Sequence, residues 1–141
     1  MLKELLKDNI IFTSNKLSWE EAVKVSAQPL LEKNLIKQSY IESIINSVKQ
    51  QGFYIVISPE IAFPHARFPE GVNKICLSLL VSTEKIQFGA NKDIKLIFCV
   101  GFIDDNSHME MLQELATFLS NEDNIQKLLV AKQDTDVLSL L

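Results

Sequence analysis

Glycine, proline and cysteine are scarce in this sequence of 141 residues, which contains four glycines, four prolines and two cysteines. So little glycine and proline excludes a fibrous or low-complexity chain. Cys76 and Cys99 each stand alone in an apolar run and form no CxxC motif, so neither a zinc site nor redox chemistry is indicated. We expect both to be small core residues of a reduced protein.

Long apolar runs are also missing. The longest strongly apolar stretch without a charge, residues 96–103, is eight residues long, whereas a membrane-spanning helix needs about 20. The N-terminal residues MLKELLKDN alternate charge with leucine and lack the apolar run of a signal peptide. We therefore expect a cytoplasmic protein without direct membrane insertion.

Excess positive charge is absent, because 14 basic and 18 acidic side chains give a net charge of −4. This balance gives no electrostatic footprint for nucleic acid. The sequence has no GxxxxGK[ST] or GxGxxG loop, no GxSxG motif and no HExxH motif. We expect no nucleotide, nicotinamide or flavin cofactor, and no metal ion.

What is present indicates one α/β domain spanning residues 1–141. The length fits a single domain, and 47% hydrophobic residues argue against disorder. Helical and strand patterns alternate along the chain, which favours a layered α/β domain. The expected strands are 10–12, 53–57, 61–63, 75–81 and 94–102. The expected helices are 2–7, one from Ser18 that Pro29 interrupts or kinks near its end, one from Ser39 that stops at Gly52, one from Ser107, 121–131 and 135–141.

Three of these helix starts are predicted from capping boxes, in which a serine is followed three residues later by glutamate. The pairs are Ser18 with Glu21, Ser39 with Glu42, and Ser107 with Glu110.

The first candidate for chemistry is His65, in the sequence Phe63-Pro64-His65-Ala66-Arg67. Pro64 stiffens the exit from a strand, and residues i and i+2 of extended chain point to the same side. His65 and Arg67 are therefore expected to face one spot. An imidazole is a nucleophile and a guanidinium binds phosphate oxygens, so the pair indicates phosphoryl handling. The alternative is a surface histidine on a turn, with an arginine for solubility.

The second candidate is His108, which follows Ser107 and shares a helix face with Leu112, Leu115 and Leu119. A helix N-terminus binds anions and disfavours a cationic histidine. We expect a neutral imidazole that donates a hydrogen bond to an anion or to another imidazole. The alternative is a histidine at the edge of the core, bonded to backbone.

Together these residues resemble a known family. A strand followed by residues 61–67 (IAFPHAR) and then Gly71-Val72 resembles the phosphorylation-site motif of enzyme IIA domains. These belong to the fructose–mannitol superfamily of the bacterial phosphoenolpyruvate-dependent sugar phosphotransferase system. The resemblance continues through residues 87–89, the apolar run 96–98, the helix led by His108 and the tail 121–141, and so covers nearly the whole chain.

The resemblance implies a mixed β-sheet with helices on both faces and a role as a phosphoryl carrier. His65 would accept the phosphoryl group from the carrier protein HPr and pass it to a cysteine of an enzyme IIB partner, which serves a membrane enzyme IIC. Arg67 would neutralise phosphoryl oxygens, and His108 would lie beside His65. Phe63 and Phe68 are candidates for the surface on which HPr and enzyme IIB dock.

Within the superfamily, PHAR followed by Pro-Glu-Gly-Val, and the run 106–108, look most like the ascorbate-type branch, although Phe68 is inserted before Pro69. Fructose and mannitol members usually carry a glycine near Glu60, and this chain does not. An alternative function is a stand-alone regulator controlled by phosphorylation of His65. A second alternative is a binding module without phosphoryl chemistry.

Overall fold

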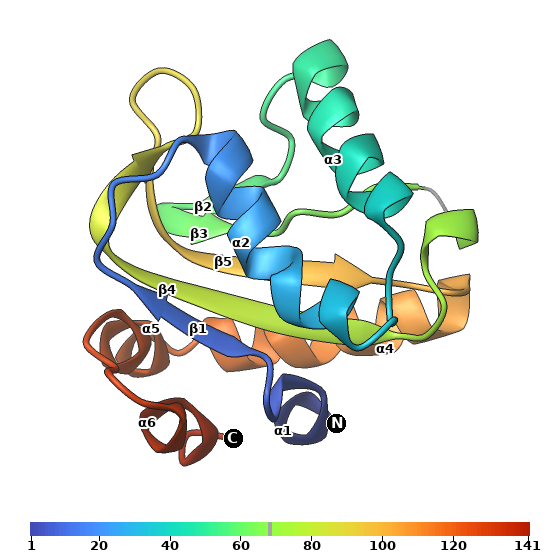
Figure 1. Ribbon diagram of the computed structural model, residues 1–141. Helices are drawn as coiled ribbons and strands as arrows, with labels where there is room; N and C mark the ends of the chain where they lie inside the picture. The colour runs from blue at the N-terminus through green and yellow to red at the C-terminus, as the bar shows by residue number, and fades with distance from the viewer. Residues whose placement is uncertain (68) are drawn as a thin grey trace.

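The computed structural model describes residues 1–67 and 69–141. Phe68, one of the two residues expected in the docking surface, lies outside them. Helices and strands alternate along the chain as the sequence predicts (Figure 1). The elements are α1 (Leu2–Leu6), β1 (Ile10–Thr13), α2 (Trp19–Glu32), α3 (Gln38–Gln51), β2 (Val56–Ser58), β3 (Glu60–Ala62), the 3-10 helix η1 (Pro69–Gly71), β4 (Cys76–Gln87), β5 (Asp93–Gly101), α4 (Asp105–Leu119), α5 (Glu122–Leu129) and α6 (Asp134–Leu138).

Five strands of the described chain form one mixed sheet in the order β1-β4-β5-β3-β2. β4 pairs with β1 in parallel and with β5 in antiparallel orientation. β3 lies parallel to β5 and antiparallel to β2. The expected mixed sheet with helices on both faces is therefore confirmed, and the apolar run near residues 94–102 is the central strand β5.

The sheet separates two hydrophobic cores. α2 and α3 cover one face, while α1, α4, α5 and α6 cover the other (Figure 1). Neighbouring residues of β5 alternate between them: Ile97 and Cys99 belong to the first core, and Leu96 and Phe98 to the second. The expectation that the cysteines are core residues is confirmed, because Cys76 is buried like Cys99 and both are free thiols.

The helix start predicted at Ser18 is confirmed. The Glu21 N–H donates to Ser18 Oγ over 3.1 Å, and the Ser18 N–H donates to Glu21 Oε1 over 2.9 Å. Pro29 does not interrupt α2, which continues to Glu32. Only the hydrogen bond that an N–H at residue 29 would have donated is missing.

The other two predicted capping boxes are wrong. α3 starts at Gln38 after Lys37, whose N–H donates to the Gly71 carbonyl over 2.9 Å, so a contact distant in sequence sets this start. α4 is capped by Asp104, whose carboxylate accepts the Ser107 N–H over 2.7 Å. A carboxylate is a stronger acceptor than a serine hydroxyl, so the helix begins earlier than predicted.

The strand predicted over residues 53–57 is also mostly wrong, because β2 begins only at Val56. Gly52 has a positive φ of 86°, and the Tyr54 N–H donates back to the Gly52 carbonyl, which makes a turn. Phe53 packs edge-on against Trp19 with ring centroids 5.3 Å apart. Of the two aromatic residues in the predicted strand, Phe53 therefore packs against the core and Tyr54 contacts the loop that carries His65.

The two closing helices are present but shorter than predicted, as α5 and α6. No helix among the described residues has the length and apolar character needed to span a membrane.

Candidate functional site

The sheet topology brings His65 and His108 together. His65 follows the end of β3, and His108 lies in α4, which follows the end of β5. Because β3 and β5 are parallel neighbours, their carboxyl ends point in the same direction, where α/β sheets commonly bind ligands. Two residues 43 positions apart in sequence thus reach the same cavity.

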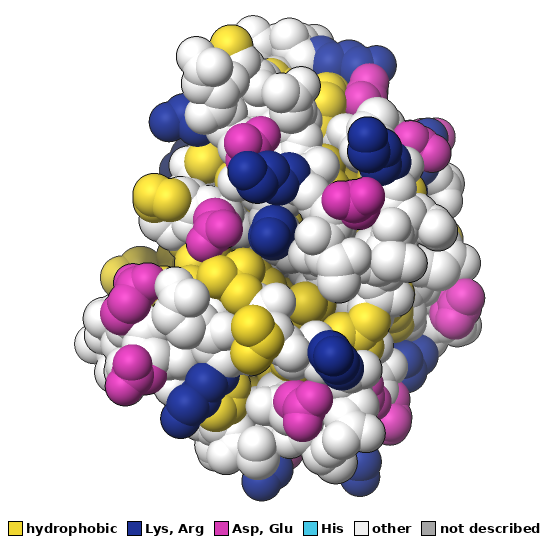
Figure 2. Space-filling view, turned by 90° about the vertical axis from the view of Figure 1, so that its left-hand side faces the viewer, with side chains coloured by type: hydrophobic (Ala, Val, Ile, Leu, Met, Phe, Trp, Pro, Cys, Tyr) yellow, Lys and Arg dark blue, Asp and Glu magenta, His cyan; other side chains and the backbone are white. Residues whose placement is uncertain are grey.

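That cavity has a volume of about 470 Å³ and a largely apolar wall. Its lining residues are Ile57, Ser58, Phe63, His65, Val100, Phe102, His108, Leu112, Ala116, Leu119 and Ser120. The two imidazoles are therefore polar groups in an apolar recess. No histidine is visible on the face shown in Figure 2, where acidic and basic side chains surround an apolar strip.

The His65 ring is held in one orientation. Its Nδ1 lies 2.6 Å from the Phe63 carbonyl oxygen. Because a carbonyl oxygen only accepts, Nδ1 must carry the hydrogen, and the lone pair of the neutral ring lies on Nε2. Burial lowers the pKa of His65 below its ordinary value, and the neighbouring His108 and Arg67 side chains lower it further, against the opposing effect of the Phe63 bond. The ring is thus neutral near pH 7, and the lone pair on Nε2 is chemically able to act as a nucleophile.

The loop that carries His65 is anchored on both sides. The Phe63 N–H donates to the Ile55 carbonyl over 2.7 Å, and the Val100 N–H donates to the Pro64 carbonyl over 3.1 Å. The Tyr54 hydroxyl donates to the His65 carbonyl over 2.5 Å, and the Tyr54 ring meets the imidazole edge-on at 5.4 Å. Such anchoring limits the movement of the imidazole relative to the cavity.

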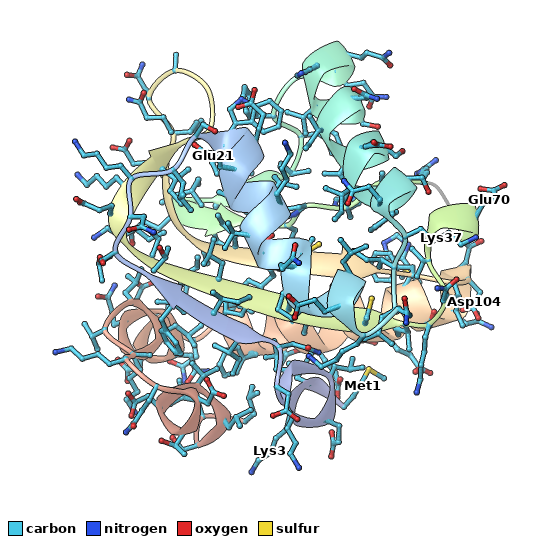
Figure 3. All side chains as sticks on the ribbon, in the orientation of Figure 1. Met1, Lys3, Glu21, Lys37, Glu70 and Asp104 are labelled. Carbon is cyan, nitrogen blue, oxygen red and sulfur yellow. The ribbon has the colours of Figure 1, made fainter. Side chains whose placement is uncertain are left out.

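His108 is the fourth residue of α4, one turn beyond the Asp104 cap, and not the first residue after a Ser107 cap as predicted. Figure 3 shows Asp104 at the edge of the molecule, where α4 begins. The His108 ring stacks on Phe102, with centroids 4.1 Å apart and planes 30° from parallel. This stacking turns the imidazole toward the cavity it shares with His65.

Arg67 and Phe63 lie differently from the two histidines. Arg67 is exposed and is not among the described residues that line the cavity, although its charge reaches His65. Phe63 is only 7% exposed and packs edge-on against Phe98 at 5.5 Å, so it forms a wall of the cavity and not a docking surface. Among residues 1–67 and 69–141, no three His, Cys, Asp or Glu side chains are grouped to hold a metal ion.

Sequence reasoning missed the two tyrosines near His65. Tyr40 falls within the helix predicted from Ser39, and Tyr54 falls within the predicted strand 53–57, but the sequence assigns neither to the site. The signal available for Tyr40 was that a buried tyrosine hydroxyl needs a hydrogen-bond partner. That partner, the Val100 carbonyl, lies 60 residues away and cannot be found from the sequence.

A family model described as "Phosphoenolpyruvate-dependent sugar phosphotransferase system, EIIA 2" matches residues 4–141. The chain belongs to this family. As an EIIA 2 chain it is a phosphotransferase component, and the resemblance drawn from the sequence is confirmed.

Relatives of the EIIA 2 chain differ in the sugar that they are named for. The ascorbate-specific EIIA component of Escherichia coli strain K12 is 28% identical, over 99% of this chain and 94% of the relative. The mannitol-specific cryptic enzyme IIA component of the same strain is 35% identical, over 86% of this chain and 85% of the relative.

Solved structures share the fold. A PTS IIA protein of Streptococcus mutans is 29% identical and superposes with a TM-score of 0.90, covering 97% of this chain and 90% of that one. The IIA protein in an Escherichia coli complex of enzyme IIA and phosphorylated enzyme IIB for mannitol has a TM-score of 0.78 at 21% identity, over 94% and 93% of the two chains.

Proposed function

We propose that this chain is a cytoplasmic phosphoryl carrier in which His65 Nε2 takes a phosphoryl group from HPr and passes it to a cysteine of an enzyme IIB partner. The observation that carries the proposal is the bond from Nδ1 to Phe63, which leaves Nε2 as the nucleophilic atom of a neutral ring at an apolar cavity. Family membership supports the same chemistry.

The two transfers balance without a metal or nucleotide. The Nε2 lone pair attacks phosphorus, the phosphorus–nitrogen bond of the donor phosphohistidine breaks, and the donor imidazole leaves with the electron pair. The thiolate of enzyme IIB then attacks phosphorus, and the bond to Nε2 breaks. Between these steps the His65 ring keeps its Nδ1 hydrogen and is cationic, a charge that the Phe63 carbonyl stabilises.

Neighbouring groups would act on the phosphoryl oxygens. His108, at the same cavity, would donate a hydrogen bond to them. Arg67, two residues from His65, would bring a guanidinium over the site when a partner docks. Phosphoryl transfer depends mainly on such positioning and charge stabilisation.

Exposed apolar side chains around the cavity suit transient docking of HPr and then of enzyme IIB. Ile57 is 50% exposed, Ile103 46% and Met109 66%. Ile57 lines the cavity, and Ile103 and Met109 flank Phe102 and His108 in sequence. Each partner must leave before the other binds, so a small interface is expected. The membrane enzyme IIC would be reached only through enzyme IIB. The ascorbate-specific relative, which aligns over 99% of this chain, supports L-ascorbate as the sugar.

The deciding experiment is phosphorylation of the purified protein with phosphoenolpyruvate, enzyme I and HPr, followed by intact mass. We expect one added phosphoryl group that is acid-labile and alkali-stable, and none on His65→Ala. His108→Ala is the matched control, since it removes the other imidazole and should still accept the group, but more slowly. A folded wild-type protein without an adduct would contradict the proposal, and an adduct that enzyme IIB cannot remove would favour the regulatory alternative.

A further inference from the structure

A buried tyrosine ties together the loop that carries His65. Tyr40, on α3, is 0% exposed. Its hydroxyl donates to the Val100 carbonyl over 2.6 Å and accepts the Ala66 N–H over 3.3 Å. One phenol oxygen thus joins the end of β5 to the residue after His65.

The opposite side of His65 is attached to the same point. The Val100 N–H donates to the Pro64 carbonyl over 3.1 Å. Pro64, Val100, Tyr40 and Ala66 therefore form a closed ring of hydrogen bonds around the backbone of His65. Val100 is 1% exposed and belongs to the central strand, so the anchor is among the most rigid parts of the chain.

We propose that Tyr40 is a positioning residue, whose hydroxyl fixes the backbone on both sides of His65 and thereby aims Nε2 into the cavity. The inference rests on the proposed carrier function and adds to it a residue that does not touch the phosphoryl group. A phenol suits the task because one oxygen can donate and accept at once. Burial raises the pKa of Tyr40, so the hydroxyl keeps its hydrogen at every pH where the protein works.

The hydroxyl is the part that matters. Tyr40→Phe keeps the ring in the core but leaves the Val100 carbonyl and the Ala66 N–H without their partner. The loop then retains the backbone bonds of Phe63 and Pro64 and the bond to the His65 carbonyl. It loses the bond that closes the ring, so the His65 imidazole can move away from the Phe63 carbonyl that accepts from Nδ1. A displacement of about 1 Å at a reacting atom lowers a rate on the order of 10²-fold.

Two readouts test this on the full chain. The first is the single-turnover rate of phosphoryl transfer from phospho-HPr, which we expect to fall by about tenfold or more in Tyr40→Phe. The second is the nitrogen NMR spectrum of the His65 imidazole without any phosphoryl donor. In the wild type it should show the hydrogen on Nδ1, and in Tyr40→Phe it should show a mixture of tautomers. A merely structural role would leave that signature unchanged.

Ile44→Val is the matched control, because Ile44 lies on the same helix, is 0% exposed and has no polar group to bond the loop. It should lose stability yet keep its transfer rate within twofold of wild type. An equal loss of rate in Ile44→Val would assign the effect to general loosening of the core and overturn the inference. So would a wild-type rate and tautomer in Tyr40→Phe.

Amide hydrogen exchange keeps the inference testable if Tyr40→Phe fails to fold. The Ala66 amide of the wild type should exchange slowly because it is bonded to a buried oxygen. Exchange as fast as that of an exposed amide would overturn the inference. Failure of the carrier function itself would appear differently, as a wild-type protein that accepts no phosphoryl group while the NMR signature and the protection of Ala66 are both present.

Discussion

His65 and His108 face one cavity but are held in opposite ways. His65 lies on a loop, and hydrogen bonds fix its ring nitrogen, its carbonyl and both neighbouring residues. His108 lies on a regular helix, and its ring is held by stacking on Phe102, with no side-chain hydrogen bond to another described residue. Under the proposed function, the difference would separate a group that presents one particular atom from a group that can adjust.

This contrast has a chemical basis. A nucleophile that attacks in line requires a fixed lone pair, which the Phe63 bond provides. In the proposed mechanism, His108 would donate a hydrogen bond to phosphoryl oxygens that move as the group arrives and leaves, and a stacked ring without other side-chain hydrogen bonds to the described residues suits that role. In this proposal the loop would hold the attacking atom in place, and the helix would supply the hydrogen-bond donor.

The largest expected effect that tests the contrast between the two histidines is on the rate of phosphoryl transfer, in variants of His108. His108→Ala should slow transfer from HPr and to enzyme IIB on the order of 10²-fold, because one donor to the phosphoryl group is lost. Quenched-flow single-turnover assays of transfer from HPr and of transfer to enzyme IIB measure the two rates. His108→Gln should recover part of the rate, since its amide donates a hydrogen bond. Normal rates in His108→Ala would remove this residue from the mechanism.

A smaller effect concerns pH and sharpens the contrast from the side of His65. Its pKa is lowered by burial, so near and below the ordinary value of about 6.5 the unfolded chain binds a proton that the folded chain does not. The contribution of the neutral ring to stability is thus complete above that value and is lost as the pH falls toward the folded pKa. Thermal unfolding between pH 7 and 5 should show a larger fall in Tm for the wild type than for His65→Gln. An identical fall in both would contradict the buried, neutral state of the ring.

The smallest effect tests backbone strain next to the His65 loop. Glu60, at the start of β3, has a φ of 70°, a conformation that glycine adopts without cost. Glu60→Gly should therefore raise the free energy of unfolding by about 0.5–1 kcal/mol, measured by denaturant titration. Asn91→Gly is the control, because Asn91 has a φ of 64° but asparagine tolerates this region. A loss of stability in Glu60→Gly would show that its side chain contributes more than the strain costs.

The parts of the fold and of the candidate site that could be predicted depend on residues close together in the sequence. The start of α2 at Ser18 depends on residues three apart, so the sequence predicts it correctly. The apolar run that becomes β5 and the PHAR motif that indicates the family are local too. Glu60 is an intermediate case. The sequence shows that this chain lacks the glycine usual near this position in fructose and mannitol members, but it does not show that Glu60 itself has a positive φ.

Contacts distant in sequence explain the rest. α3 begins at Gln38 because Lys37 bonds Gly71, and no serine-glutamate spacing contains that information. The burial of Phe63 depends on Phe98, and the exposure of Arg67 depends on where the loop leaves the sheet. Tyr40 lies 26 residues from Ala66 and 60 from Val100, so the two hydrogen bonds of its hydroxyl exist only in the folded chain.

The parallel pairing of β3 with β5 also determines where the chain can change length. His65 follows Ala62 by three residues, and His108 follows Gly101 by seven. An insertion in either connection would separate the two imidazoles, whereas the turn between β4 and β5 touches neither connection. Exposed turns of that kind accept added residues most readily. A fluorescent label or affinity tag placed near Asn91 should thus leave the distance between the His65 and His108 imidazoles unchanged.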